Sequence, residues 1–171
     1  SNLVDESDPY NIKRVKVVDA GNSAGRIIFI DNQNYNNGIQ LNQINGPESD
    51  LPVTFIFSAL KPVVLTGTIT GNVRMFFAGD FQFGMGTETV AYNGLTMFMS
   101  NGDMNICGSI WSDKNNPGGG FLSSDKDITI VESASFQGQI QCRGNFKTSG
   151  LIQFNDSVLK APGFTVPKGM K

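Results

Sequence analysis

The side chains best suited to chemistry in this sequence are two aspartates and an asparagine that recur at equivalent places. Asp80 and Asp103 each follow a glycine, and so does Asn145. Stacked carboxylates could bind a cation or a sugar, and paired carboxylates hydrolyse glycosides. Without a Lys, an Arg or a second acidic pair beside them, two carboxylates are too few for lyase or glycosidase chemistry. The sequence therefore favours a polar ladder at a turn, in which these side chains cap backbone N–H groups.

Composition excludes several function classes. The 171 residues contain no His, so Ser–His–Asp hydrolysis, Cys–His proteolysis and His-based metal sites cannot be built from this chain alone. Thirteen Lys and Arg against 15 Asp and Glu give a net charge of −2, and the longest basic cluster, residues 13–16 (KRVK), is short. We therefore expect no nucleic-acid partner. Thirteen Phe residues supply the burial that a folded domain needs.

No metal and no cofactor is predicted. Asp31, Asn34 and Asn36 offer oxygen ligands, but their spacing does not follow a calcium loop. The three glycines at 118–120 lack the Lys-Ser/Thr of a phosphate-binding loop. The two cysteines, Cys107 and Cys142, are too few for a disulfide framework and do not form a CxxC motif.

The elements that must position these residues are short strands. Helical periodicity is almost absent, whereas alternating or continuous apolar runs such as residues 26–30 (RIIFI), 53–57 (VTFIF) and 128–131 (ITIV) are separated by Gly, Asn and Asp. The sequence therefore predicts an all-β fold.

A repeat divides the chain into similar units. Residues 71–83 (GNVRMFFAGDFQF) match residues 94–106 (GLTMFMSNGDMNI) with a period of 23, and residues 144–152 (GNFKTSGLI) match residues 102–110 with a period of 42. We attribute the longer period to an inserted Gly-rich loop at 112–126. Coils of roughly 20–25 residues predict a parallel β-helix, or β-solenoid, in which coils bury their inner faces by stacking.

This repeat predicts the organisation of the chain. Residues 61–160 form the solenoid, residues 161–171 a C-terminal tail, and residues 1–60, which lack the unit, an N-terminal β-rich cap or a separate lobe. A β-sandwich or jelly roll is the alternative architecture. Under the 42-residue register Cys142 aligns with Ser100, far from Cys107 along the coil, so no disulfide is expected between the two cysteines.

Candidate binding residues lie in the loops. The only Trp, Trp111, stands at the base of the predicted insertion, Asn115 and Asn116 lie within it, and Phe121 lies on its far side. Buried, Trp111 and Phe121 would anchor the loop, which is the favoured interpretation; exposed, they would contact a carbohydrate or a protein. Tyr35 lies in the Asn-rich loop at 31–38, which could also contact a ligand.

Residues 94–156 resemble the β-solenoid segments of some bacterial type IV pilus minor pilins and related surface proteins. The resemblance lies in residues 102–110 (GDMNICGSI) and 133–140 (SASFQGQI). Bactofilins, which are cytoskeletal polymers of short β-helical coils, have a similar pattern. The sequence departs from pilins in having no N-terminal hydrophobic helix, and from bactofilins in its loop at 112–126 and its non-repeating start.

The resemblance implies a non-catalytic structural or adhesive domain of a bacterial surface or pilus protein, at the cell surface or outside the cell. Its loops would contact a protein or glycan. A polysaccharide-acting enzyme using Asp80 and Asp103, and a scaffold that polymerises end to end, are the alternatives. Homo- or hetero-oligomeric assembly stays open. The sequence starts with Ser1-Asn2, which is typical of a cleaved tag, so a signal peptide or membrane anchor upstream stays open as well.

Overall fold

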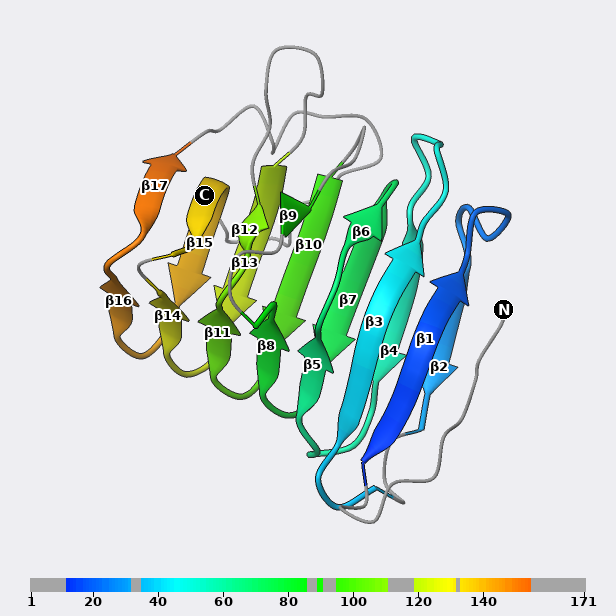
Figure 1. The fold of residues 1–171 in the computed structure, drawn as a ribbon, viewed down its shortest axis with the longest axis horizontal. Coiled ribbons are helices and arrows are strands. Elements are labelled where there is room, and N and C mark those ends of the chain that lie inside the picture. The colour runs from blue at the N-terminus through cyan, green and yellow to red at the C-terminus, as the bar shows by residue number, and fades with distance from the viewer. Residues whose placement is uncertain are drawn as a thin grey trace.

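The computed structural model is a parallel β-solenoid, which confirms the predicted fold class (Figure 1). The structure describes residues 12–31, 35–85, 89–90, 95–110, 119–131 and 133–154. Every regular element in this part of the chain is a β-strand, and the strands pair in parallel.

Two sheets form the walls of the solenoid. The first sheet contains, in spatial order, β1 (Lys13–Asp19), β3 (Ile39–Asn45), β5 (Val63–Leu65), β8 (Phe81–Phe83), β11 (Met104–Ile106), β14 (Ile128–Ile130) and β16 (Phe146–Thr148), and β6 (Ile69–Thr70) pairs with the end of β3. The second sheet contains β2 (Ile27–Ile30), β4 (Val53–Phe57), β7 (Val73–Phe77), β10 (Leu95–Ser100), β13 (Gly119–Ser124), β15 (Ser135–Cys142), β12 (Ser109–Ile110) and β9 (Thr89–Val90), and β17 (Leu151–Phe154) pairs with β15.

The predicted 23-residue repeat is one coil of the solenoid. Thr96 pairs with Val73 in the second sheet, and Met104 pairs with Phe81 in the first, so both walls advance by the same 23 residues. The structure contains no disulfide between Cys107 and Cys142, both of which lie in the described residues, so this prediction is also confirmed.

The structure differs from the predicted insertion at 112–126. Residues 119–124 of that segment form β13, which pairs with β10 and β15. Ile128 lies between Met104 and Phe146 in the first sheet, so the 42-residue period contains two coils. At Gly120 the glycine has a packing cause, because a Cβ there would lie 3.0 Å from the Phe136 ring and 3.2 Å from the Ile110 side chain.

The N-terminal region also differs from the expected cap or lobe. From residue 12 onward it provides β1 to β4, which pair in parallel with each other and with β5 and β7 of the following coil. The solenoid therefore continues across residue 60. These first coils are joined by longer turns without the Gly-Asp corner, and for that reason the repeat is not visible in their sequence. The predicted C-terminal tail at 161–171 lies outside the described residues.

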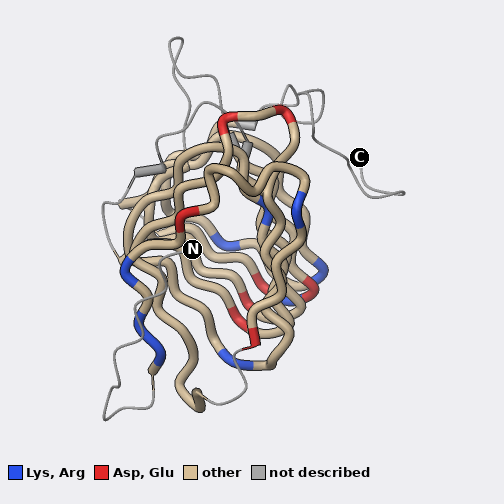
Figure 2. Tube along the Cα trace, turned by 90° about the vertical axis from the view of Figure 1, so that its right-hand side faces the viewer, with Lys and Arg blue, Asp and Glu red and all other residues tan. Residues whose placement is uncertain are grey.

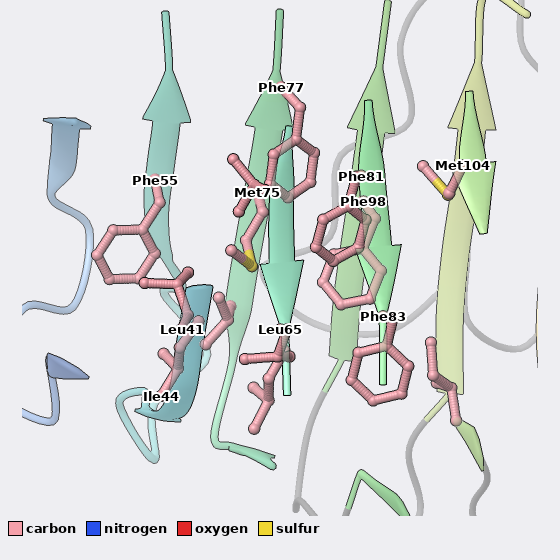
Figure 3. Close-up of a cluster of buried hydrophobic side chains, with 14 of the residues drawn as sticks. Leu41, Ile44, Phe55, Leu65, Met75, Phe77, Phe81, Phe83, Phe98 and Met104 are labelled. Carbon is pink, nitrogen blue, oxygen red and sulfur yellow. The ribbon is translucent and has the colours of Figure 1, made fainter. Parts of the chain in front are cut away.

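The core is a column of side chains from both sheets (Figure 3). Phe77 stacks on Phe81 with ring centroids 4.0 Å apart and on Phe57 at 5.2 Å, and Phe98 packs against Phe81 at 4.9 Å. All four side chains are buried. Burying a side chain of this size stabilises a fold by about 1.5–3 kcal/mol, so the stack contributes strongly to holding successive coils together.

Candidate functional site

A ladder of carboxylates runs along one corner of the solenoid. Asp80 Oδ1 accepts the backbone N–H of Asp103 at 2.8 Å, Asp103 Oδ1 accepts that of Asp127 at 3.2 Å, and Asp127 Oδ1 accepts that of Asn145 at 2.7 Å. Figure 2, which views the solenoid along its axis, shows acidic residues of successive coils near this lower corner. The predicted polar ladder at a turn is therefore confirmed, with Asp127 as a further member.

A second ladder supports the same corner from inside. Ser100 Oγ donates to the carbonyl of Gly79 at 2.6 Å and accepts the N–H of Gly102 at 2.9 Å. Ser124 Oγ repeats both bonds one coil later, with the carbonyl of Gly102 at 2.6 Å and the N–H of Lys126 at 2.9 Å. The corner is thus a structural feature that connects coils. In the described residues, no three acidic or Cys side chains gather in a way that could hold a metal ion.

The outer faces of the two sheets differ in polarity. On the first sheet the outward positions along the middle of the strands are mostly polar: Gln40, Val64, Gln82, Asn105, Thr129 and Lys147. On the second sheet, pairing between strands places four apolar side chains in one outward line, which we name the apolar row: Phe29, Ile56, Phe76 and Met99. Ser123 and Gln141 continue this line.

A groove runs beside the apolar row, along the solenoid axis. Its second wall is a line of residues that directly follow the strands, which we name the polar row: Ser58, Ala78, Asn101 and Asp125. The open groove has a volume of about 290 Å³, and Phe57, Phe77, Ser100 and Ser123 complete its lining between Ile56, Phe76 and Met99 on one side and the polar row on the other. The groove therefore has one apolar wall and one mainly polar wall.

Over β7, β10 and β13 the accessible apolar surface of the outer face is one row wide, whereas on β2 the exposed Ile27 lies beside Phe29. The next outward line includes Arg74, Met97 and Phe121, which pair across β7, β10 and β13. Met97 is only 2 % exposed and Phe121 only 3 %. Arg74 is half-buried, and the loss of water around it lowers the pKa of its guanidinium. A ligand on this part of the sheet can therefore reach the apolar row but not Met97 or Phe121 beside it.

Of the residues expected to bind in the loops, Phe121 and Tyr35 do not line this groove. Trp111, Asn115 and Asn116 lie outside the described residues. Phe121 is buried on β13, and Tyr35 packs beside β1, with the Lys13 Nζ 5.5 Å from its ring centroid. The two that the structure describes therefore lie in different parts of the solenoid.

Sequence reasoning missed the groove, although a signal for it was present. The three runs that contain Ile56, Phe76 and Met99 are apolar at consecutive positions (FIF, MFF and MFM) instead of alternating with polar residues. A continuous apolar run indicates a strand with two apolar faces. One of those faces is the core, so the other had to be the outer surface.

No protein-family model, curated protein or solved structure matches this chain. Within the ranges that the structure describes, no helix is long and apolar enough to cross a membrane. The two ladders and the groove are therefore the structural features that bear on function.

Proposed function

We propose that this chain is a non-catalytic structural and adhesive domain of a bacterial cell-surface or pilus protein, and that it binds a surface component in the groove. The observation that carries the proposal is the apolar row on the outside of the second sheet. Phe29 is 72 % exposed and Ile56, Phe76 and Met99 are partly exposed, and a contiguous apolar patch on a protein surface often marks a binding site. The opposite sheet, which is built from the same coils, has a mostly polar outer face, so the apolar row is not a general property of this solenoid.

The position of the groove supports a role in rigid display. Ile56, Phe76 and Met99 lie on β4, β7 and β10, each of which is paired with a strand on both sides. Side chains on such strands are held more firmly than side chains on loops, so less conformational entropy is lost when a partner binds. A stacked solenoid is also suited to the mechanical role of a surface fibre.

The hydrogen bonds of the acidic ladder support a non-catalytic role. Asp80 and Asp103, the pair that a glycosidase hypothesis would use, each accept a backbone N–H from the next coil. Neither carboxylate lines the groove. The surface or pilus location rests on the resemblance of residues 94–156 to pilin solenoid segments.

Retention on immobilised surfaces tests this function. The purified chain is passed over bacterial cell walls, extracellular-matrix proteins and polysaccharides, and compared with Phe76→Ser and with Gln82→Ser, a control on the outer face of the first sheet. We expect at least one surface to retain the wild type and the control, with about tenfold weaker retention of Phe76→Ser, since truncating a central aromatic costs of the order of 1–2 kcal/mol. No retention on any surface, or equal retention of the two variants, would overturn the proposal.

An activity assay tests the non-catalytic part separately. The polysaccharides of the same panel are incubated with the chain and with Asp103→Asn, and new reducing ends or unsaturated products are measured. We expect no product above the blank with either protein. Turnover by the wild type that is lost in Asp103→Asn would show that the ladder is catalytic.

A further inference from the structure

We propose that the groove binds a neutral, linear glycan whose chain lies along the solenoid axis. The proposal rests on the proposed binding function and specifies the chemistry of the ligand. The groove combines an apolar wall, whose central side chain is Phe76, with a polar wall that contains Ser58 and Asn101. A sugar ring has the same division, with C–H groups on its faces and hydroxyl groups around its edge. The ring faces would pack on Phe76 and its apolar neighbours, while the hydroxyl groups would bond to the polar row.

Protein segments fit this groove less well. An added β-strand needs an unpaired sheet edge, whereas β4, β7 and β10 already pair on both sides. An amphipathic helix buries an apolar stripe about 100° wide, which requires more than one row of apolar partners. Met97 and Phe121 are too deeply buried to provide a second row. A narrow ligand that needs no backbone hydrogen bonds from the groove is therefore favoured.

The groove repeats the positions of its lining residues from coil to coil. Each coil contributes one residue from each row, in the pairs Ile56 and Ser58, Phe76 and Ala78, Met99 and Asn101, and Ser123 and Asp125. Adjacent strands lie about 4.8 Å apart, so the four pairs span roughly 14 Å along the axis. Two of the pairs, Ile56 with Ser58 and Met99 with Asn101, join an apolar to a polar side chain on either side of Phe76, so a ligand with a repeating unit can use both, which favours a polymer over a single small molecule.

The charges at the groove favour a neutral chain. Of the described residues that line it, Asp125 alone is charged, and its Oδ1 lies 3.6 Å from Nε of Arg143. The pair brings no net charge. An anionic glycan would meet Asp125 without a surplus cation in the wall, and a cationic glycan would compete with Arg143. A neutral glycan is neither repelled by Asp125 nor in competition with Arg143 for it.

Titration calorimetry with defined oligosaccharides tests the glycan proposal. The full chain is titrated with hexasaccharides of neutral β-1,4-glucan, α-1,4-glucan, mannan and galactan, and with an anionic hexagalacturonate. We expect one or more neutral hexasaccharides to bind, the matching disaccharide to bind more weakly, and Phe76→Ala to weaken binding about tenfold. Asn101→Ala should also weaken binding, whereas Gln82→Ala, on the opposite sheet, should not. Binding of hexagalacturonate alone, no binding of any neutral sugar, or unchanged binding by Phe76→Ala would overturn the proposal.

The retention assay separates this proposal from the function on which it rests. The retaining surface is treated either with periodate, which destroys glycans, or with a protease. Loss of Phe76-dependent retention after periodate but not after protease supports the glycan. The reverse result identifies a protein partner, which overturns the glycan proposal and leaves the adhesive function standing. If no surface shows Phe76-dependent retention, both proposals fail.

Discussion

The carboxylate of Asp80 accepts the backbone N–H of Asp103 at 2.8 Å, although the two residues are 23 positions apart in the sequence. The bond connects one coil of the solenoid to the next at a tight corner. It is repeated from Asp103 to Asp127 and from Asp127 to Asn145. A side chain that a glycosidase hypothesis would use as a catalytic acid therefore helps to hold successive coils together.

Removing one carboxylate should weaken this corner without unfolding the protein. Asp103→Ala deletes the acceptor for the N–H of Asp127, and a lost side-chain cap costs about 1 kcal/mol. Asp103→Asn keeps an acceptor oxygen and relieves repulsion between stacked carboxylates, so it should stay within about 0.5 kcal/mol of the wild type. Urea unfolding measures both. An Asn variant as unstable as the Ala variant would contradict the hydrogen-bond account.

A methyl group at the corner glycine should be more damaging. A Cβ at Gly102 would lie 2.2 Å from Oδ1 of Asp80 and 2.8 Å from its backbone nitrogen. Because the corner backbone must shift, Gly102→Ala should cost about 2–3 kcal/mol. Gly21→Ala is the matched control, since its nearest neighbour outside the adjoining residues would be 3.6 Å away, an ordinary contact. Equal midpoints for the two variants in thermal unfolding would show that the corner is not tightly packed.

One core position should be improvable. Thr96 faces the core between Val73 and Gly120, is fully buried, and its hydroxyl has no hydrogen-bond partner within the described part of the chain. Thr96→Val keeps the shape and removes the unsatisfied oxygen, so it should stabilise the fold by about 1 kcal/mol. Thr129→Val, at an outward position of β14, should change stability by less than about 0.5 kcal/mol. Destabilisation by Thr96→Val would mean that the hydroxyl is satisfied.

The sequence predicted the architecture where the corner is tight. Gly102 and Asp103 repeat Gly79 and Asp80, and a Cβ at Gly102 would crowd the carboxylate of Asp80 in the preceding coil. This steric demand appears directly as a motif. Asp127 escaped detection because Lys126 stands where the other members of the ladder have a glycine.

The other differences between the predicted and the observed structure also arise from contacts between coils. Gly120 belongs to a run of glycines that is typical of a loop. On β13, however, a glycine is needed at this position because Phe136 and Ile110 pack against it. The groove exists because Ile56, Phe76 and Met99 lie in line on adjacent strands. Predicting this alignment requires the number of residues in each coil, and the Gly-Asp corners do not give that number for the first coils. Residue types alone therefore pointed to the loops, whereas the pairing of the strands points to a sheet face.

The central claim is that the apolar row faces outward while its chain neighbours face the core, and thiol labelling tests it most directly. Met99→Cys and Ser100→Cys are each made in a background with Cys107→Ser and Cys142→Ser, and their reaction rates with a maleimide are measured under native conditions. Met99 is half-buried on the outer face, whereas Ser100 is 5 % exposed. We expect the thiol at position 99 to react at least about tenfold faster, because position 100 must wait for local opening. A thiol at position 100 that reacts as fast as the one at position 99, or faster, would contradict the outward-facing row and the function built on it.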